Sequence, residues 1–378
     1  MTAATPAVGA PAAGLVVREA TEADNAALVA LAAACTMRGD IALRVDRAPD
    51  FFALTRLEGD DARVGVVTDG AGRVLACAAV ARRPAYVNGV PSETYYASDL
   101  KVHPEARGTG AADLLSCWGR DAWAGVADPD APYVLTILAG NRAMERRARG
   151  PRGTPVLARF ATLSVMAIPL LWRRRERVEG IGVREATEGD LEEMAGVWAR
   201  FAPTRQFGAA LDAGAFARWI ARAPGLSASD HLVATDARGR IIGFVGVWDQ
   251  TSFKQTRVVG YSPRLALVRA GFNALAPLVK APALPAPGGV LPALATVRLC
   301  ASEPRVLRAL LLEAYRRHRG GRFGFLTVCL DVRDPLIPAT RGLLAQPTIV
   351  HAYASSGRGW TEARPLRRLP LHYESALV

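Results

Sequence analysis

The sequence lacks the features that mark several common classes of protein. Its five cysteines are scattered without the paired spacing of a zinc site or a disulfide framework, so both are excluded and a reduced, intracellular protein is expected. A Gly-Lys-Ser/Thr loop is absent, and no Gly-x-Gly-x-x-Gly follows the first predicted strand, which excludes a P-loop and a Rossmann nucleotide site. There is no zinc-finger spacing, helix-turn-helix pattern or aromatic RNA-binding signature, so nucleic acid is not expected as a partner.

Long hydrophobic runs and a targeting segment are also lacking. The apolar segment 160–172 is too short to cross a membrane and contains Pro169, so we predict a strand there. A second apolar region, 265–297, carries Arg269, Lys280 and many prolines; we expect a packed insertion, with attachment to a lipid surface as the open alternative. The first 14 residues have neither the basic start nor the apolar core of a signal peptide, which predicts a disordered tail and a cytoplasmic protein.

Lysine is nearly absent, with 3 lysines against 44 arginines, and the charge is unevenly distributed. Residues 1–170 hold 18 Lys and Arg against 18 Asp and Glu, whereas residues 171–378 hold 29 against 17, so the net charge of +12 lies in the second half. A basic surface attracts anions. The candidate partners are therefore an anionic substrate, an acidic carrier protein or an acidic lipid surface.

What the sequence does contain is a glycine-rich turn in residues 100–112, LKVHPEARGTGAA. An apolar strand end leads into this turn, and an amphipathic helix follows it, with apolar residues three or four apart. Gly108 and Gly110 allow successive backbone N–H groups to point at one spot, and the helix adds the positive end of its dipole. The segment therefore predicts an anion site that fits a diphosphate.

This segment resembles motif A of the GNAT superfamily of acetyl-CoA-dependent N-acyltransferases, in which Arg/Gln-x-x-Gly-x-Gly/Ala follows a strand ending Leu-x-Val-x-Pro. The matching positions are Leu100, Val102, Pro104, Arg107, Gly110 and Ala112. The resemblance implies transfer of an acetyl group from acetyl-CoA to an amine of a small molecule or protein, by direct attack and without a metal. The expected acyl-CoA-binding residues are Leu100, Val102, Arg107, Gly108, Thr109, Gly110, Ala111, Ala112 and Asn141.

The resemblance also places the reaction on the strand that precedes the glycine turn. The Leu100 N–H is expected to bind the acyl carbonyl oxygen, and Val102 to pair with the pantetheine arm. Because strand side chains alternate, we expect Tyr96 and Ser98 to share the face of Leu100, and Asp99 to point away unless a bulge shifts the register. Tyr96, Ser98 and Leu100 are the candidate catalytic residues; the alternative for Tyr96 is a strand aromatic half in the core.

A second GNAT motif is only half present. The strand at 133–138 and Asn141 match, but Ala148 stands where the family has a tyrosine that acts as an acid. A noncatalytic acyl-CoA-binding or scaffold protein is therefore the alternative function, and a longer acyl donor from CoA or a carrier protein is another. Several arginines near this motif are candidates for the CoA phosphates or the thiolate, or else form a solvated face: Arg142, Arg146, Arg147, Arg149 and Arg152.

An internal repeat sets the predicted architecture. Residues 17–24, VREATEAD, return as residues 183–190, VREATEGD, and each copy predicts a strand, a capping box and a helix. We predict an α/β (α+β) fold of two tandem GNAT-like domains, each a mixed, mostly antiparallel twisted sheet flanked by helices, a layout that resembles mycothiol synthase. The predicted segments are a disordered tail at 1–14, a GNAT domain with the acyl-CoA site at 15–172, a linker at 173–180, and a degenerate domain at 181–378 with a proline-rich insertion at 261–292.

The second copy is called degenerate because of the residues that precede its corresponding helix. Pro304, which has no N–H group, stands where the first copy has its glycine turn. The second anion site is therefore predicted to be lost, and the second domain is expected to help form the acceptor site.

Overall fold

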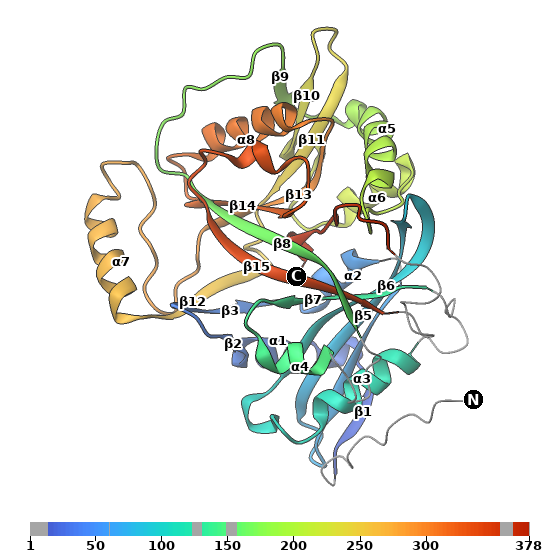
Figure 1. Cartoon of the computed structure of the whole chain (residues 1–378). Coiled ribbons are helices and arrows are strands. Elements are labelled where there is room, and N and C mark those ends of the chain that lie inside the picture. Colours follow the sequence, from blue (N-terminus) through green and yellow to red (C-terminus); the bar gives the residue numbers. More distant parts are fainter. Residues whose placement is uncertain (1–13, 60, 123–130, 149–156, 356–365, 378) are drawn as a thin grey trace.

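The computed structural model describes residues 14–59, 61–122, 131–148, 157–355 and 366–377. The predicted tail at 1–14 lies outside these ranges except for its last residue. We call the chain before residue 173 the first half and the rest the second half. Figure 1, coloured along the sequence, shows strands of both halves side by side in the middle of the molecule.

A twelve-stranded sheet runs through the described residues in the order β1-β4-β5-β6-β7-β15-β8-β14-β13-β11-β10-β9. One end is built from the first half: β1 (Val16–Glu19), β4 (Asp61–Thr68), β5 (Val74–Val87), β6 (Val90–Val102) and β7 (Tyr133–Leu138). The other end is built from the second half: β9 (Gly182–Glu185), β10 (His231–Thr235), β11 (Ile241–Trp248), β13 (Ala293–Ala301) and β14 (Phe325–Asp331). Between them lie β8 (Ala158–Pro169) and β15 (Gln346–Ser355).

The two central strands join the halves, because each pairs with a strand of the opposite half. β15 pairs antiparallel with β7, with Val350 opposite Leu138, and β8 pairs antiparallel with β14, with Leu326 opposite Ile168. β8 and β15 also pair with each other. The two separate sheets expected from the sequence are thus one continuous sheet, while the strand predicted at 160–172 is confirmed as β8. The domain boundary at 173–180 stays a prediction.

The two copies of the repeated segment fold alike. Thr21 and Asp24 form the predicted capping box in one copy, and Thr187 and Asp190 form it in the other. Each aspartate also accepts from an arginine of the preceding strand at 2.7 Å, and this contact lowers the pKa of Asp24 to about 2. The capping box closes a short 3-10 turn, and α1 (Asn25–Ala34) and α5 (Leu191–Phe201) follow directly.

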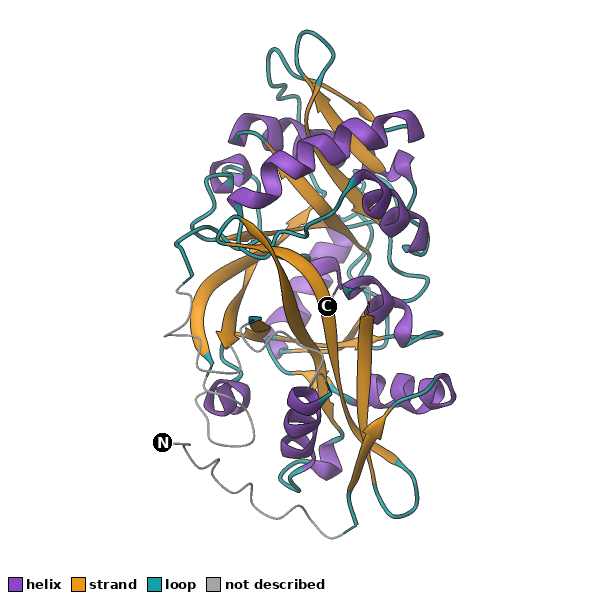
Figure 2. Cartoon of the chain, turned by 90° about the vertical axis from the view of Figure 1, so that its right-hand side faces the viewer, coloured by secondary structure: helices purple, strands orange, loops and turns teal. Residues whose placement is uncertain are grey.

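Helices cover both faces of the sheet, as Figure 2 shows. In the first half α3 (Ala111–Asp121) packs on β4, β5 and β6, and in the second half α8 (Pro304–His318) packs on β10, β11 and β13. The apolar stripe of α8, which includes Leu307, Leu310 and Leu311, is wholly buried and belongs to the largest core cluster. The remaining helices near the sites described below are α2 (Phe52–Glu58), α4 (Arg142–Ala148) and α6 (Ala213–Arg222).

A second sheet of three strands also joins the halves, in the order β12 (Gln255–Tyr261), β3 (Ile41–Asp46) and β2 (Thr36–Met37). The helix after it, α7 (Pro263–Leu275), stands apart from the main body in Figure 1 and buries none of its residues. Leu267, for example, is 77% exposed. The expectation of a packed insertion is therefore wrong for this helix. Within the described residues, every helix is too short or too polar to cross a membrane.

Candidate functional site

The glycine turn before α3 forms a cradle of backbone N–H groups. Gly108 and Gly110 have φ angles of +85° and +89°, a conformation that glycine adopts without strain. Gly110 is the N-cap residue of α3 and offers no side chain to its first turn. Across the described ranges, no residue accepts a hydrogen bond from the N–H groups of Gly108, Gly110, Ala111 or Ala112. Free N–H groups at the start of a helix, together with the positive end of its dipole, suit an anion.

The other residues of the turn hold its shape. The Thr109 hydroxyl donates to the Ala106 carbonyl oxygen at 2.8 Å, and His103 Nδ1 accepts from the Glu105 N–H at 3.4 Å. Arg107 is exposed beside the cradle. Of the predicted acyl-CoA-binding residues, the structure therefore groups 107–112 around one point at the start of α3.

β6 leaves β7 just before it reaches this cradle. The two parallel strands pair only at Tyr95–Ala97 and Tyr133–Leu135, and beyond this point β6 has no neighbouring strand on that edge in the described residues. The predicted residues Leu100 and Val102 lie on this free stretch, and both pack against the cluster of Ala111 and Leu115 of α3. The free edge of β6 thus ends a few residues before the cradle along the chain.

A β-bulge at Asp99 overturns one sequence prediction. Asp99 has a φ of +52°, and the register with β5 shifts between the pairs Ala79–Ser98 and Cys77–Lys101. The extra residue reverses the alternation of side chains. Leu100 therefore faces α3, whereas Tyr96 and Ser98 face the opposite side of the sheet. The prediction that these three share a face is wrong, because it assumed an unbroken strand.

Ser98 contacts a carboxyl group that the sequence analysis missed. Its hydroxyl donates to Glu58 Oε2 at 2.8 Å, and Glu58 is buried at the end of α2. Burial, with the nearby charge of Asp99, raises the pKa of Glu58 to about 8. The only sequence signal was its position four residues after Leu54, on the apolar side of a short helix. Glu58 is thus a carboxyl group that changes charge close to neutral pH, on the face of Tyr96 and Ser98.

Asp99 lies on the same side of the sheet as Glu58, but its carboxyl group is ionised at neutral pH. It forms ion pairs with Arg47, at 2.7 Å, and with Lys101. Burial alone would raise the pKa of Asp99, but these two cations hold it well below its usual range. Asp99 therefore remains ionised and anchors the bulge, whereas Glu58 is the group that can exchange a proton.

Tyr96 belongs to a network of three hydroxyl groups. Its hydroxyl lies 3.0 Å from that of Tyr373 and 3.2 Å from Thr136 Oγ1, and Tyr373 lies 2.9 Å from Thr136 Oγ1. The Tyr96 side chain is buried, as the alternative of a core aromatic expected, and burial raises its pKa to about 12. Tyr373 comes from a segment near the end of the described chain, which no local sequence pattern linked to this strand.

A cavity of about 90 Å³ opens next to Glu58, between the two halves. We call it the inter-half cavity and define it by Glu58, Arg83, Trp219, Arg298 and Glu374, which line it. It lies next to the β6 residues, because Glu58 accepts from Ser98 and the Arg83 guanidinium stands 4.5 Å from the centre of the Tyr96 ring. A cavity of this size holds several water molecules or a small organic group.

The second half repeats the strand geometry of the first. β13 pairs with β14 in parallel only at Ala293–Ala295 and Phe325–Thr327, and a bulge residue with positive φ follows, here Arg298 at +51°. The helix that follows, α8, begins at Pro304 instead of a glycine turn. Its N-cap residue Glu303 has an extended backbone, with φ at −156°. The cradle of the first half has no counterpart there.

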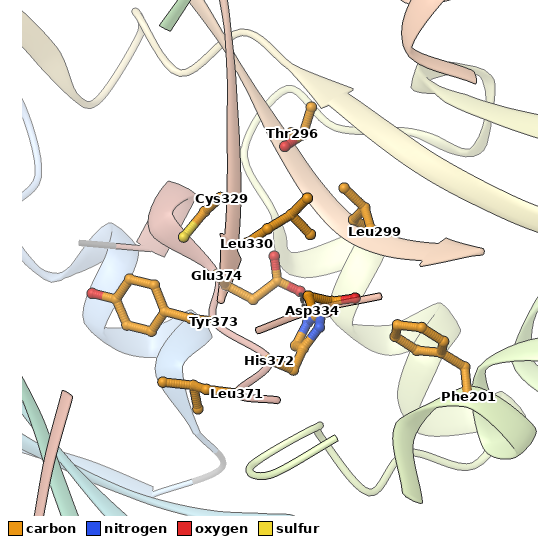
Figure 3. Close-up of a pocket in the computed structure, with 10 residues that line it drawn as sticks. All are labelled: Phe201, Thr296, Leu299, Cys329, Leu330, Asp334, Leu371, His372, Tyr373 and Glu374. Carbon is orange, nitrogen blue, oxygen red and sulfur yellow. Dashed lines mark hydrogen bonds and ion pairs between the residues drawn. The ribbon is translucent and has the colours of Figure 1, made fainter. Parts of the chain in front are cut away.

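The gap between β13 and β14 is occupied by residues 371–374, as Figure 3 shows. Both carboxylate oxygens of Glu374 accept from the Arg298 N–H at 3.1 Å, and one also lies 3.0 Å from His372 Nε2. The Tyr373 ring points the other way, away from Glu374 (Figure 3). The space left here is about 10 Å³, room for about one water molecule.

Comparison with known proteins identifies the fold. Neither a family model nor a curated protein matches the chain. Several solved structures, in contrast, match the chain over most of its length. A GCN5-related N-acetyltransferase from Sphaerobacter thermophilus superposes with a TM-score of 0.54 and 19% identity, covering 93% of this chain and 97% of its own. Saccharomyces cerevisiae N-myristoyltransferase with bound myristoyl-CoA gives a TM-score of 0.59 and 10% identity over 92% and 84% of the two chains. The chain has the GCN5-related N-acetyltransferase fold.

One region departs from the GNAT motifs named above. Ala148 is buried where the family tyrosine would stand, and Asn141 caps α4 by accepting from the Met144 N–H at 3.3 Å. Arg147 donates to the Ala112 carbonyl oxygen at 2.6 Å and pairs with Asp113 at 2.5 Å. Arg147 therefore clamps α4 onto the first turn of α3, while Arg149 and Arg152 lie outside the described residues. Nowhere in the described ranges do three His, Cys, Asp or Glu side chains gather as a metal site would need.

Proposed function

We propose that this chain is an N-acyltransferase that moves an acetyl group from acetyl-CoA to an amine, at one site in its first half. The observation that carries the proposal is the cradle at 107–112 beside the free edge of β6. Four unpartnered N–H groups and a helix N-terminus suit the diphosphate of CoA, and the free edge suits its pantetheine arm. The fold shared with a GCN5-related N-acetyltransferase and with an N-myristoyltransferase that binds myristoyl-CoA supports the same assignment.

The chain's own residues supply the steps of the reaction. The Leu100 N–H binds the carbonyl oxygen of the thioester, where negative charge develops as the amine attacks. The amine nitrogen forms the new bond to the carbonyl carbon, the carbon–sulfur bond breaks, and the thiolate leaves and takes up a proton from solvent water. Glu58, with a pKa of about 8, accepts the proton that the amine loses. Ser98 positions Glu58, and Tyr96 orders the hydroxyl network beside it.

We further propose that the two halves are tandem GNAT-like domains, 15–172 and 181–378, and that only the first binds acyl-CoA. The matching bulges at Asp99 and Arg298 and the matching capping boxes support the tandem arrangement. Pro304 and the segment that fills the β13–β14 gap support a single site. The second half then contributes the far wall of the inter-half cavity, where the amine would lie.

A second candidate is a noncatalytic acyl-CoA-binding protein, which Ala148 favours. A donor with a longer acyl chain, delivered by CoA or by a carrier protein, is a variant of the first proposal. Isothermal titration with acetyl-CoA, longer acyl-CoAs and acyl carrier proteins separates the donors. Release of CoA with a broad panel of amines then separates catalysis from binding alone. Binding of none of these donors would reject every version.

A further inference from the structure

The charges around the inter-half cavity are strongly unequal. Four arginines line it, and two of these, Arg218 and Arg222, stand exposed at its rim. Of the two carboxyl groups, Glu374 is already paired with Arg298 at 3.6 Å. Glu58 is mostly protonated at pH 7, because its pKa is about 8. The cavity is therefore electropositive at neutral pH, and it attracts small anions.

Two of its arginines are held by aromatic rings. The Arg298 guanidinium lies 4.0 Å from the centre of the Trp219 ring, and the Arg83 guanidinium lies 4.5 Å from that of Tyr96. Contact with a ring fixes the position of a guanidinium group without using its N–H donors. Both side chains are thus positioned in advance. The Arg83 donors remain for hydrogen bonds in the plane of the group, whereas Arg298 also pairs with Glu374 at 3.6 Å.

Donors on both arginines are buried without an acceptor. The Nε atoms of Arg83 and Arg298 are inaccessible to solvent, and neither has a hydrogen-bond partner in the described chain. The Arg298 side chain as a whole is 5% exposed. A ligand in the cavity therefore cannot reach these Nε atoms and would meet the terminal nitrogens of the two guanidinium groups that line it. A carboxylate or phosphate group is the natural partner of a guanidinium, because it accepts two parallel hydrogen bonds.

The cavity also has an end that suits the amine. Glu58 and Ser98 lie on the β6 side, while Trp219 and Arg298 come from the second half. An acceptor placed between them would turn its amine to Glu58 and its other end to Arg298, while Arg83, over the Tyr96 ring, reaches the cavity from the first half. A cavity of about 90 Å³ requires these two groups to be only a few bonds apart.

We propose that the acceptor is a small amine that carries a carboxylate or phosphate group a few bonds from its nitrogen, and that Arg83 and Arg298 bind this anionic group. The proposal rests on the proposed acyl transfer, whose amine substrate it specifies. It gives the bulge in β13 a role, because the positive φ of Arg298 places its side chain in the wall of a cavity shared with the first half.

The test uses amines in matched pairs that differ in the anion alone. β-Alanine is compared with β-alaninamide, and phosphoethanolamine with ethanolamine, by release of CoA at saturating acetyl-CoA. We expect kcat/KM to be at least 10-fold higher for the charged member of one pair, and the better pair distinguishes carboxylate from phosphate. Equal rates within both pairs, or a preference for the uncharged members, would overturn the proposal while acyl transfer itself stands.

Variants link the preference to the named side chains. Arg83→Gln should reduce the preference for the charged member about 10-fold with little change in acetyl-CoA affinity. Arg82→Gln is the matched control, because Arg82 is the next residue on β5 and pairs with Glu93 outside the cavity. Arg298→Gln should reduce the preference for the charged amine to a similar extent. If Arg298→Gln does not fold, the test is the comparison of Arg83→Gln with Arg82→Gln. An unchanged preference in Arg83→Gln would overturn the assignment.

Binding measurements separate this proposal from the proposed function. β-Alanine and phosphoethanolamine are titrated into the protein with CoA present and with CoA absent. If no amine is acetylated, weaker binding of the charged probe to Arg83→Gln than to wild type still supports an anion site. Absence of binding of both probes overturns the anion site, whether or not acetyl-CoA binds.

Discussion

The two strand gaps of this molecule share one backbone device and differ in what surrounds it. In each, a pair of parallel strands separates after three residue pairs, and a bulge residue with positive φ lies on the strand that leads to the helix, Asp99 in one and Arg298 in the other. The first gap is followed by a glycine cradle, whereas the second is followed by Pro304 and is filled by residues 371–374. Under the proposed function, only the gap that is followed by free N–H donors at the next helix binds acyl-CoA.

The largest effect is expected at Glu58, which belongs to the first gap and has no role in the second. Glu58→Gln should lower kcat by about 1,000-fold, in the range typical of a lost general base, with little change in acetyl-CoA affinity. Because a base must be ionised, wild-type activity should rise with pH about a midpoint near 8 and the variant should lose this dependence. Glu22→Gln, at an exposed carboxylate, is the control. A wild-type profile without a transition near pH 8 would contradict the role of Glu58.

The second gap is expected to matter for stability. Glu374→Ala should lower the free energy of unfolding by about 3 kcal/mol, because it leaves the buried Arg298 guanidinium and N–H without their partner. Urea denaturation measures the change. Glu303→Ala, which removes an exposed carboxylate in the same half, should cost less than about 0.5 kcal/mol. A loss as small as this in Glu374→Ala would mean that the 371–374 segment does not hold the second gap closed.

Matched substitutions at the two helix starts compare the gaps as coenzyme sites. Gly110→Trp should raise the Kd of acetyl-CoA about 100-fold, because it fills the cradle and removes hydrogen bonds worth about 3 kcal/mol. Glu303→Trp, at the N-cap of α8, should leave the Kd unchanged. Gly239→Trp controls for backbone strain, since Gly239 has a similar φ of +78° in a distant hairpin. Similar affinities in all three variants would contradict the placement of the site.

The smallest effect is expected at Tyr373. Its hydroxyl forms hydrogen bonds with Tyr96 and Thr136 of the first half, although residues 371–374 as a whole fill the second gap. Tyr373→Phe should lower the free energy of unfolding by about 1 kcal/mol, because Tyr96 and Thr136 keep their mutual hydrogen bond at 3.2 Å. Urea denaturation of Tyr373→Phe and Glu374→Ala under the same conditions compares the losses in free energy of unfolding of the two variants. If Tyr373→Phe were the more damaging variant, the segment would serve mainly the first half.

Local patterns predicted the elements that depend on neighbouring residues. The capping boxes at Thr21 and Thr187, the strand at 133–138 and the glycine turn before α3 all follow from residues within one or two turns of each other. The capping box was visible because the threonine and aspartate must be three residues apart. The cradle was predictable for the same reason, because all of its N–H donors come from one short segment of the sequence.

The missed features depend on contacts between distant segments. The exchange of β8 and β15 between the halves, and the approach of Tyr373 to Tyr96, leave no periodic signal in either segment. The bulge at Asp99 reversed the side-chain alternation on which the shared face of Tyr96 and Leu100 was predicted. Glu58 became a candidate base only when the structure placed it beside Ser98.

The most direct test of the account is amide hydrogen–deuterium exchange with and without acetyl-CoA, compared between residues 107–114 and residues 301–308. Binding of the coenzyme should slow exchange of the four unpartnered N–H groups within 108–112, which become hydrogen-bonded, and leave 301–308 unchanged. Protection of 301–308, or binding of acetyl-CoA without protection of 108–112, would contradict a coenzyme site in the first half alone.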